Sequence, residues 1–230
     1  MPYFFFDEYY LLLVLPAVLF ALICKLRVSS SFKKYSQIRT RRGMTGAEAA
    51  RKVCELGEAG QVAIEHTKGQ LSDHYDPRSN VIRLSDSVYG SDSIAAVGVA
   101  AHEAGHAAQY AQGYGPIKLR AAIIPVTQVA SNLAMPLVLL GFFFNYGLLI
   151  DIGIILFGAA VFFQLVTLPV EFNASRRAMA LLRSGGVLSE DELAGAKKVL
   201  SAAAMTYVAA MAVALAQLLR LIFISQRRRH

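Results

Sequence analysis

Residues 100–108 read AAHEAGHAA, and the fold is organised around this His-Glu-x-x-His motif. His102 and His106 are four positions apart, so on a helix both imidazoles leave the same face, one turn apart. That spacing lets two ring nitrogens reach one tetrahedral Zn²⁺. Glu103 lies about 100° further round the helix, where it can take a proton from a zinc-bound water. The motif predicts a zinc site with Glu103 as its general base.

The motif lies in the middle of a predicted helix from Ser93 to Gln112. Residues 91–93 offer an N-cap, no proline interrupts residues 94–111, and Gly113 follows. The alternative is a buried helix whose histidines bind other side chains, but two imidazoles and a carboxylate are costly to bury without a metal. Because the predicted helix carries His, Glu and Gln, we expect it to be a core helix and not a membrane crossing.

The composition indicates a membrane protein. Of 230 residues, 55% are hydrophobic, and the formal net charge is +7. This apolar fraction favours one domain plus membrane segments. The basic residues cluster beside apolar runs without an aromatic platform, so we expect the lipid bilayer as a partner and no nucleic acid. Neither Cys24 nor Cys54 has the sequence context of a disulfide partner or a zinc ligand. This favours a reducing compartment for the soluble part.

Four apolar runs predict a mainly α membrane protein with about four transmembrane helices. The first, residues 9–24, follows two acidic residues, whereas a cleaved signal peptide, the alternative, needs positive charge there. Residues 121–170 predict a hairpin that turns at residues 145–147. If the last run, residues 202–224, crosses the membrane, Gln217 and Arg220 lie in lipid. The arginines at 227–229 then lie outside, in conflict with the positive-inside rule. We favour a crossing over a helix lying on the membrane.

The basic residues also predict how this multi-pass protein is oriented. They follow the first run and flank both ends of the hairpin, at Lys25, Arg27, Lys33, Lys34, Arg39, Arg41, Arg42, Lys118, Arg120, Arg176, Arg177 and Arg183. The positive-inside rule places all of them in the cytoplasm. We therefore expect the N-terminus outside and the zinc site facing the cytoplasm.

The expected domain organisation has five parts. Residues 1–25 are an N-terminal transmembrane helix, 26–120 a cytoplasmic region with the His-Glu-x-x-His helix, 121–170 the transmembrane hairpin, 171–200 a helix and cytoplasmic segment, and 201–230 a C-terminal apolar helix.

Within the cytoplasmic region, Thr45 and Glu48 form a capping box for a helix that ends at Leu56. Short strands are predicted at residues 61–67, 71–75 and 80–84, and the last two flank the turn Asp76-Pro77-Arg78-Ser79. The edge of this hairpin either aligns a peptide by strand addition or only covers the core.

A catalytic zinc needs a third protein ligand and an open position for water. The remaining histidines are His66, His74 and His230, and none follows the motif at the spacing of His-Glu-x-x-His-x-x-Gly-x-x-His. Glu171 is the candidate, because two crossings separate it from His106 and an even number returns the chain to the same side. The alternative is that Glu171 pairs with Arg176 or Arg177.

Four stretches resemble the neutral zinc metallopeptidases of bacterial membranes, the YugP type: LSDHYDPRS at 71–79, VIRLS at 81–85, AAVGVAAHEAGH at 95–106 and LPVEFNASRR at 168–177. The order of strand, motif helix, membrane hairpin and Glu helix is also similar to HtpX-type membrane proteases. The resemblance implies a zincin-like (gluzincin) α+β core, Zn²⁺ bound by His102, His106 and Glu171, and a location in the bacterial cytoplasmic (inner) membrane. Ser175 stands where HtpX-type sequences usually carry an Asp, and Asn173 stands where many YugP-type sequences carry one. The resemblance therefore does not decide which side chains orient the metal ligands.

We expect a zinc metallopeptidase, an endopeptidase acting on proteins or peptides, membrane proteins among them, in which Glu103 moves a proton from water to the leaving amine. His74, Tyr75 and Arg176 are candidates for stabilising the oxyanion or binding substrate. One alternative is a site-2-type intramembrane protease, in which Asp151 would be the third ligand. The other is a membrane scaffold with a structural zinc, which a fourth ligand such as His66 or His74 would mark.

Overall fold

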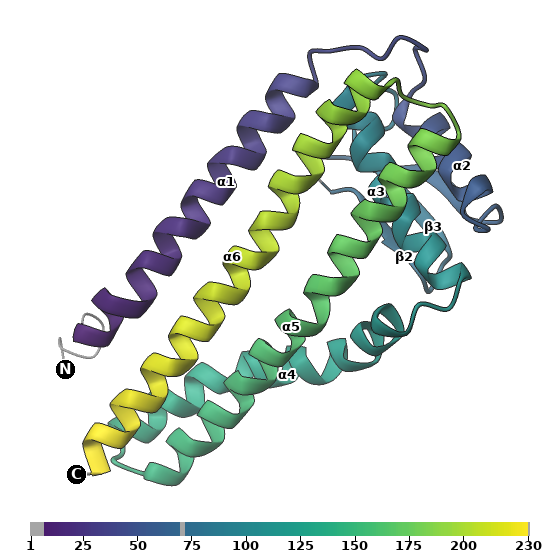
Figure 1. Cartoon of the computed structure of the whole chain (residues 1–230). Helices are drawn as coiled ribbons and strands as arrows, with labels where there is room; N and C mark the ends of the chain where they lie inside the picture. Colours follow the sequence, from purple (N-terminus) through teal and green to yellow (C-terminus); the bar gives the residue numbers. More distant parts are fainter. Residues whose placement is uncertain (1–6, 70–71, 230) are drawn as a thin grey trace. The chain divides into compact units, whose positions relative to one another are not determined.

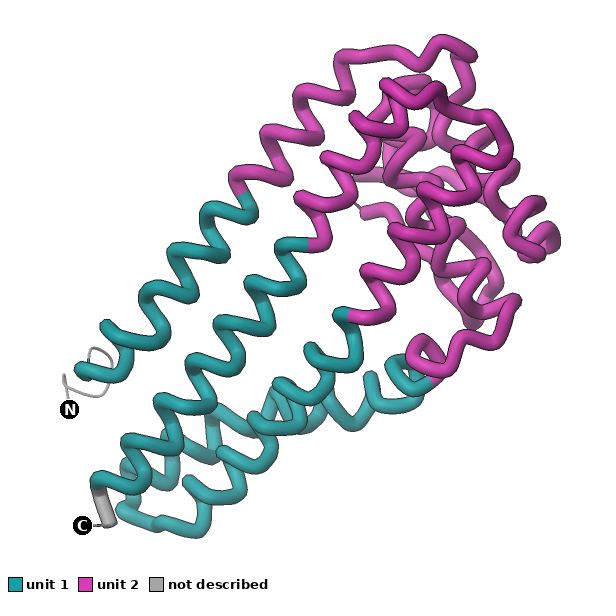
Figure 2. The backbone as a smooth tube through the Cα atoms, in the orientation of Figure 1, with its two compact units in different colours: residues 1–25, 119–168, 205–230 teal, residues 26–118, 169–204 magenta. Residues whose placement is uncertain are grey.

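The computed structural model describes residues 7–69 and 72–229, and they are mainly helical with one small sheet (Figure 1). The elements in chain order are a π-helical turn (Tyr10–Val14), α1 (Leu15–Tyr35), α2 (Gly46–Leu56), β1 (Ala63–His66), β2 (His74–Asp76), β3 (Val81–Leu84), α3 (Ile94–Ala111), α4 (Gly115–Phe143), α5 (Gly147–Ser184) and α6 (Glu190–Arg229). The chain divides into two compact units (Figure 2). Unit 1 comprises residues 1–25, 119–168 and 205–230, and unit 2 comprises residues 26–118 and 169–204.

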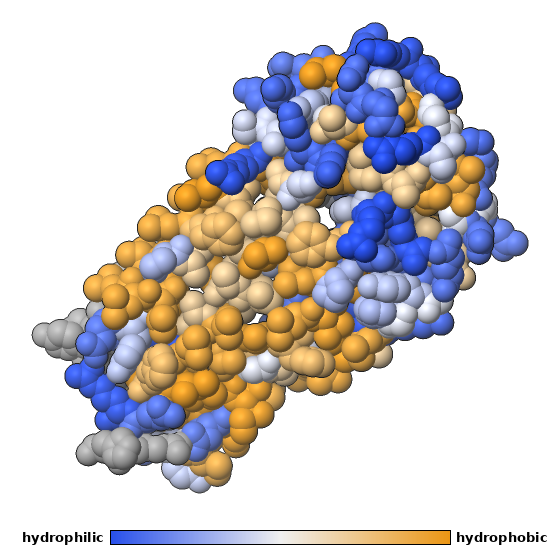
Figure 3. All heavy atoms as spheres, viewed as in Figure 1, coloured by the Kyte–Doolittle hydropathy of each residue, from blue (hydrophilic) through white to orange (hydrophobic). Residues whose placement is uncertain are grey.

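Four helices are long and apolar enough to cross a membrane, as the sequence predicted: Tyr10–Tyr35, Gly115–Phe143, Gly147–Ser184 and Glu190–Arg227. A bilayer crossing needs about 20 apolar residues, and each helix exceeds that length. Figure 3 shows hydrophobic side chains gathered over the helices of unit 1. The helix at residues 94–111 is not among the four candidates, in agreement with its prediction as a core helix.

Three of these helices extend beyond the predicted apolar runs. Helix α4 already begins at Gly115, α5 continues through Pro169 to Ser184, and α6 begins at Glu190. The start of α6 has a local cause, because the Ser189 hydroxyl and N–H both donate to the Glu192 carboxylate, at 2.8 and 2.7 Å. The apolar runs therefore locate the crossings, but the helices carry polar turns at their ends.

Within unit 1, helices α4 and α5 form the predicted hairpin. Asn145 adopts a left-handed conformation in the turn, with φ at 54°. A Cβ added at Gly153 of α5 would lie 2.8 Å from the Ala134 carbonyl oxygen of α4, so the missing side chain allows the two helices to approach closely.

Unit 1 contains acidic partners for two of the arginines that the last crossing would place in or beyond the lipid. Arg220 is buried and binds Asp7, with 2.6 Å between its Nη2 and Asp7 Oδ2. Arg227 binds Glu8 in a second pair, which is exposed. Two basic residues of α6, Arg220 and Arg227, are therefore paired with the acidic residues that precede the first span.

Unit 2 holds a buried core built around α2 and α3. Helix α2 begins with the predicted capping box, in which Thr45 and Glu48 bind each other's backbone N–H. Helix α3 begins at the predicted N-cap, where the Ser93 hydroxyl accepts from Ala96 N–H. Its buried residues are mostly alanine and glycine, and small residues of this kind let neighbouring helices come close.

The three-stranded sheet of unit 2 has the order β1-β3-β2. Strand β1 runs parallel to β3, and β2 runs antiparallel to β3 across the predicted Asp76–Ser79 turn. The strand predicted at 71–75 begins later, at His74, because the Asp73 carboxylate instead accepts from Ser85 N–H and Oγ. Residue 71 lies outside the described residues. Strand β2 is at the edge of the sheet, next to α3.

Candidate metal centre

Two histidines of α3 and one glutamate of α5 form the candidate metal centre, and all three belong to unit 2. His106 and Glu171 are buried, and Glu171 is only 2% exposed. The approach of the helices depends on Gly105, because a Cβ there would lie 2.5 Å from the Ala174 carbonyl oxygen. Glycine at this position therefore lets α5 come close enough for Glu171 to reach both imidazoles.

The ligand atoms of His102, His106 and Glu171 lie within 4.8 Å of one another. Glu171 Oε2 is 3.2 Å from His102 Nε2 and 3.6 Å from His106 Nε2. Tetrahedral Zn²⁺ with bonds of 2.0–2.1 Å separates neighbouring ligand atoms by about 3.3 Å. Two imidazole nitrogens and a carboxylate oxygen at these distances fit zinc, and a bound cation would offset the cost of burying the carboxylate.

The outward nitrogens of both histidines bind neighbouring side chains. His102 Nδ1 is 3.1 Å from Ser175 Oγ, and His106 Nδ1 is 3.0 Å from Gln109 Oε1. A zinc-binding histidine usually donates its other ring N–H in this way, which turns the free lone pair toward the metal. Ser175 lies one turn after Glu171 on α5, at the position where HtpX-type proteases usually carry an Asp, and its hydroxyl contacts His102.

The amide of Gln109 can bind His106 in one orientation only. Its Nε2 donates to the Val170 carbonyl at 2.8 Å and to Asn173 Oδ1 at 3.0 Å. Arg177 Nε also donates to Asn173 Oδ1, at 2.7 Å, which fixes that oxygen as the acceptor. Gln109 Oε1 must then accept from His106, so Nδ1 of His106 carries the proton and Nε2 is left for the centre.

Glu103 lies beside the cluster and is held by the sheet. Its Oε2 accepts from the backbone N–H of Tyr75 on β2, at 3.0 Å. Burial raises the pKa of the Glu103 carboxyl above its ordinary value, and the neighbouring carboxylates Glu171 and Asp73 act in the same direction. A carboxylate with a raised pKa is better matched to accept protons near neutral pH.

The other predicted site residues lie outside the cluster. His74 is exposed and its Nδ1 binds the Ser72 carbonyl, while the Tyr75 hydroxyl donates to Asn80. Arg176 is exposed, and within residues 7–69 and 72–229 no hydrogen bond or ion pair joins it or His74 to the three candidate ligands. Sequence reasoning missed Gln109, although its position three residues after His106, on the same helix face, was a usable signal.

Two further residues belong to the alternative hypotheses: His66 as a fourth ligand of a structural zinc, and Asp151 as the third ligand of a site-2-type protease. His66 Nε2 binds Asp86 Oδ1 at 2.6 Å and is not part of the cluster. Asp151 belongs to unit 1, whereas the cluster belongs to unit 2. In the part of the chain that is described, the cluster has three candidate ligands, which would leave a tetrahedral metal one open position.

Comparison with known proteins identifies the family of the chain. A family model described as "Putative neutral zinc metallopeptidase" matches residues 10–226, and the chain belongs to that family. Among curated proteins it is similar to the "Putative membrane protease YugP" of Bacillus subtilis (strain 168), with 47% identity over 215 residues, covering 94% of this chain and 96% of that protein. No solved structure matches. The resemblance inferred from four short stretches is confirmed over almost the whole chain.

Proposed function

We propose that this protein is a membrane-bound zinc endopeptidase of the gluzincin type, which hydrolyses peptide bonds at the cytoplasmic face of the bacterial inner membrane. The observation that carries the proposal is the convergence of His102, His106 and Glu171, with Glu103 beside them. Membership of a zinc metallopeptidase family supports it. So does the similarity to a protein described as a membrane protease.

The three clustered side chains would hold the metal, and Zn²⁺ bound there would polarise the attacking water and the substrate carbonyl. Glu103 would accept a proton from the attacking water and would pass it to the leaving amine. The Tyr75 N–H bond to Glu103 keeps the carboxylate aimed into the site. Gln109 and Ser175 orient the two imidazoles.

Strand β2 supports the choice of a peptide substrate. It occupies the edge of the sheet, and the N–H of its central residue, Tyr75, points to Glu103 and not to β3. A substrate main chain that adds to this edge would run past the general base. His74 on β2 and Arg176 on α5 are exposed, and both stay candidates for contacting the substrate or the oxyanion.

The test compares wild type with Glu103→Gln in membranes and after purification. Cleavage products are identified by mass spectrometry, and bound zinc is measured on the same samples. We expect Glu103→Gln to keep its zinc and to lose cleavage by about 100-fold or more, the usual contribution of a general base. Glu55→Gln, at an exposed carboxylate of α2, is the matched control and should cleave normally.

Two outcomes would reject the proposal. Cleavage by Glu103→Gln at the wild-type rate would exclude Glu103 as the general base. Loss of zinc from Asp151→Ala, with retention by Glu171→Ala, would assign the third ligand to the membrane hairpin and favour a site-2-type protease.

A further inference from the structure

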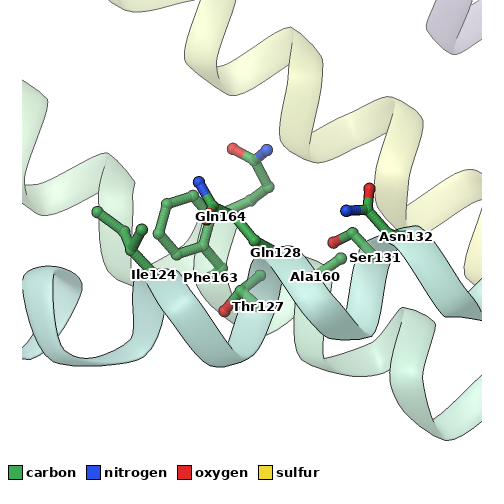
Figure 4. Close-up of a pocket in the computed structure, with 8 residues that line it drawn as sticks. All are labelled: Ile124, Thr127, Gln128, Ser131, Asn132, Ala160, Phe163 and Gln164. Carbon is green, nitrogen blue, oxygen red and sulfur yellow. The ribbon is translucent and has the colours of Figure 1, made fainter.

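A cavity of about 380 Å³, lined by both polar and apolar side chains, lies between α4 and α5, within unit 1 (Figure 4). Its volume falls at the lower end of the range of small-molecule and cofactor sites, about 300–1,000 Å³. Helix α4 contributes residues at spacings of three and four, which form one face, and α5 contributes a second such set. The lining residues are Ile124, Thr127, Gln128, Ser131 and Asn132 from α4, with Ala160, Phe163 and Gln164 from α5.

The lining carries hydrogen-bonding groups but no charge. Within the described part of the chain, the side chains of Gln128, Ser131, Asn132 and Gln164 have no hydrogen-bond partner. Gln128, Ser131 and Asn132 are also exposed. The backbone adds a further acceptor, because Pro136 lies inside α4 and has no N–H to donate to the carbonyl of Asn132.

These groups lie well inside an apolar run. Gln128 and Asn132 come five and nine residues after Ile123, the first large apolar residue of the predicted hairpin. At 1.5 Å per residue they are roughly 8 and 14 Å along the helix, which is within a hydrocarbon layer about 30 Å thick. Charged lipid headgroups do not reside at that depth. In hydrocarbon, unsatisfied amides are costly and are retained where they have a partner.

We propose that this cavity binds a membrane-embedded peptide segment whose helix is broken, so that its backbone N–H and C=O groups are free. Three carboxamides, each with donors and an acceptor, match neutral peptide groups, whereas an uninterrupted helix satisfies its own backbone and offers them nothing. The inference rests on the proposed function and names its substrate class, which is a membrane protein with a helix break inside the bilayer. Gln164 of the cavity and the candidate ligand Glu171 stand on the same helix, α5.

The test measures binding with a catalytically silent protein, so that it does not depend on cleavage. The full chain carrying Glu103→Gln and a benzoylphenylalanine in place of Phe163 is reconstituted into lipid nanodiscs. Two biotinylated single-span leucine-alanine peptides of equal length are the probes, one uninterrupted and one with a central Gly-Pro pair. We expect the interrupted peptide to crosslink about fivefold more, the ratio that one or two hydrogen bonds across membrane helices provide.

The variant that tests the lining combines Gln128→Leu with Asn132→Leu, and it should reduce the ratio to about one. The matched control combines Val126→Leu with Val129→Leu, at exposed apolar positions of the same helix, and should leave the ratio unchanged. Bound zinc and elution volume show that each variant is folded.

Three results would overturn the proposal: equal crosslinking of both probes, a ratio that survives the Gln128→Leu/Asn132→Leu change, or crosslinks formed between copies of the chain in place of the probe. A fivefold ratio together with a wild-type chain that cleaves no peptide would reject the proposed peptidase activity and leave the peptide-binding cavity in place.

Discussion

At the scale of single residues, Gln109 determines which nitrogen of His106 faces the candidate metal centre. Its amide nitrogen already donates to the Val170 carbonyl and to Asn173, so its oxygen must accept from His106 Nδ1. We expect Gln109→Leu to weaken zinc binding about 10- to 100-fold, the usual effect of removing a partner that orients a ligand. Zinc affinity is measured by competition with a chelating dye.

Gln112→Leu is the matched control for this prediction. Gln112 lies at the end of α3 and binds the Gly57 carbonyl and Arg177, but it does not touch His106. Its zinc affinity should stay within about threefold of wild type, because no partner of a ligand has been removed. Equal losses in the two variants would show that Gln109 acts through the fold and not through His106.

The sequence predicted the residues of the site better than it predicted their partners. Helical spacing indicates His102, Glu103 and His106, and the count of crossings indicates Glu171, but the roles of all four as ligands or base are still predictions. The contacts of Ser175 and Gln109 depend on the register of α3 against α5, some 65 residues apart in the chain. No local pattern encodes that register, so these partners appear only in the structure.

At the scale of elements, the distance between α3 and α5 is set by Gly105. A Cβ at this position would meet the Ala174 carbonyl at 2.5 Å, and a backbone carbonyl cannot rotate away as a side chain can. We expect Gly105→Ala to cost about 1–3 kcal/mol in free energy of unfolding, as overpacking does, and to lose bound zinc because Glu171 is pushed away. Thermal unfolding and zinc content measure the two effects.

Gly98→Ala gives a control on the same helix, seven residues earlier. A Cβ there would lie 3.4 Å from the Ala196 Cβ of α6, which is an ordinary contact distance. Alanine also favours a helix over glycine by about 1 kcal/mol, so this variant should keep its zinc and unfold at an equal or higher temperature. Zinc loss from Gly98→Ala but not from Gly105→Ala would contradict the assignment.

Elements with local signals were predicted well, and those that depend on distant pairing were not. The Thr45–Glu48 capping box and the Asp76–Ser79 turn both lie where the sequence placed them. The parallel pairing of β1 with β3 was not predicted, because two four-residue strands carry no mark of their partner. Helix α5 passes through Pro169, which removes one backbone hydrogen bond but does not end a helix held by its packing.

At the scale of the whole molecule, the ion pair of Asp7 with Arg220 joins the beginning of the first span to the end of the last. Removing one member of a buried pair is costly because the remaining charge loses its counter-ion. We expect Asp7→Ala to lower the free energy of unfolding in detergent by about 3–5 kcal/mol, and Asp7→Leu with Arg220→Leu to recover much of that loss. The exposed pair of Glu8 with Arg227 is the control, since Glu8→Ala should cost about 1 kcal/mol or less.

The same pair predicts a dependence on pH. Burial alone raises the pKa of Asp7. The hydrogen bonds from Arg220 and from the Tyr10 N–H, together with the charge of Arg220, lower it by more, so the net pKa lies below the ordinary value. The stabilisation is therefore complete above the pKa of an unfolded Asp and is lost as the pH falls through the lowered pKa. The difference between wild type and Asp7→Ala should shrink in acid. A difference that grows in acid would contradict the sign.

Pairing of these two chain ends also bears on orientation, because an even number of crossings returns both ends to one side of the membrane. The basic residues that flank the other ends of the spans lie on the opposite side of the membrane, which the positive-inside rule assigns to the cytoplasm. Buried Cys24 and Cys54 give little background in thiol labelling, and burial raises the pKa of Cys54 to about 12. In spheroplasts we expect a membrane-impermeant maleimide to label Gln226→Cys at once and Ser79→Cys only after lysis. Labelling in the reverse order would place the candidate metal centre outside the cytoplasm, and labelling of both before lysis would reject the fourth crossing.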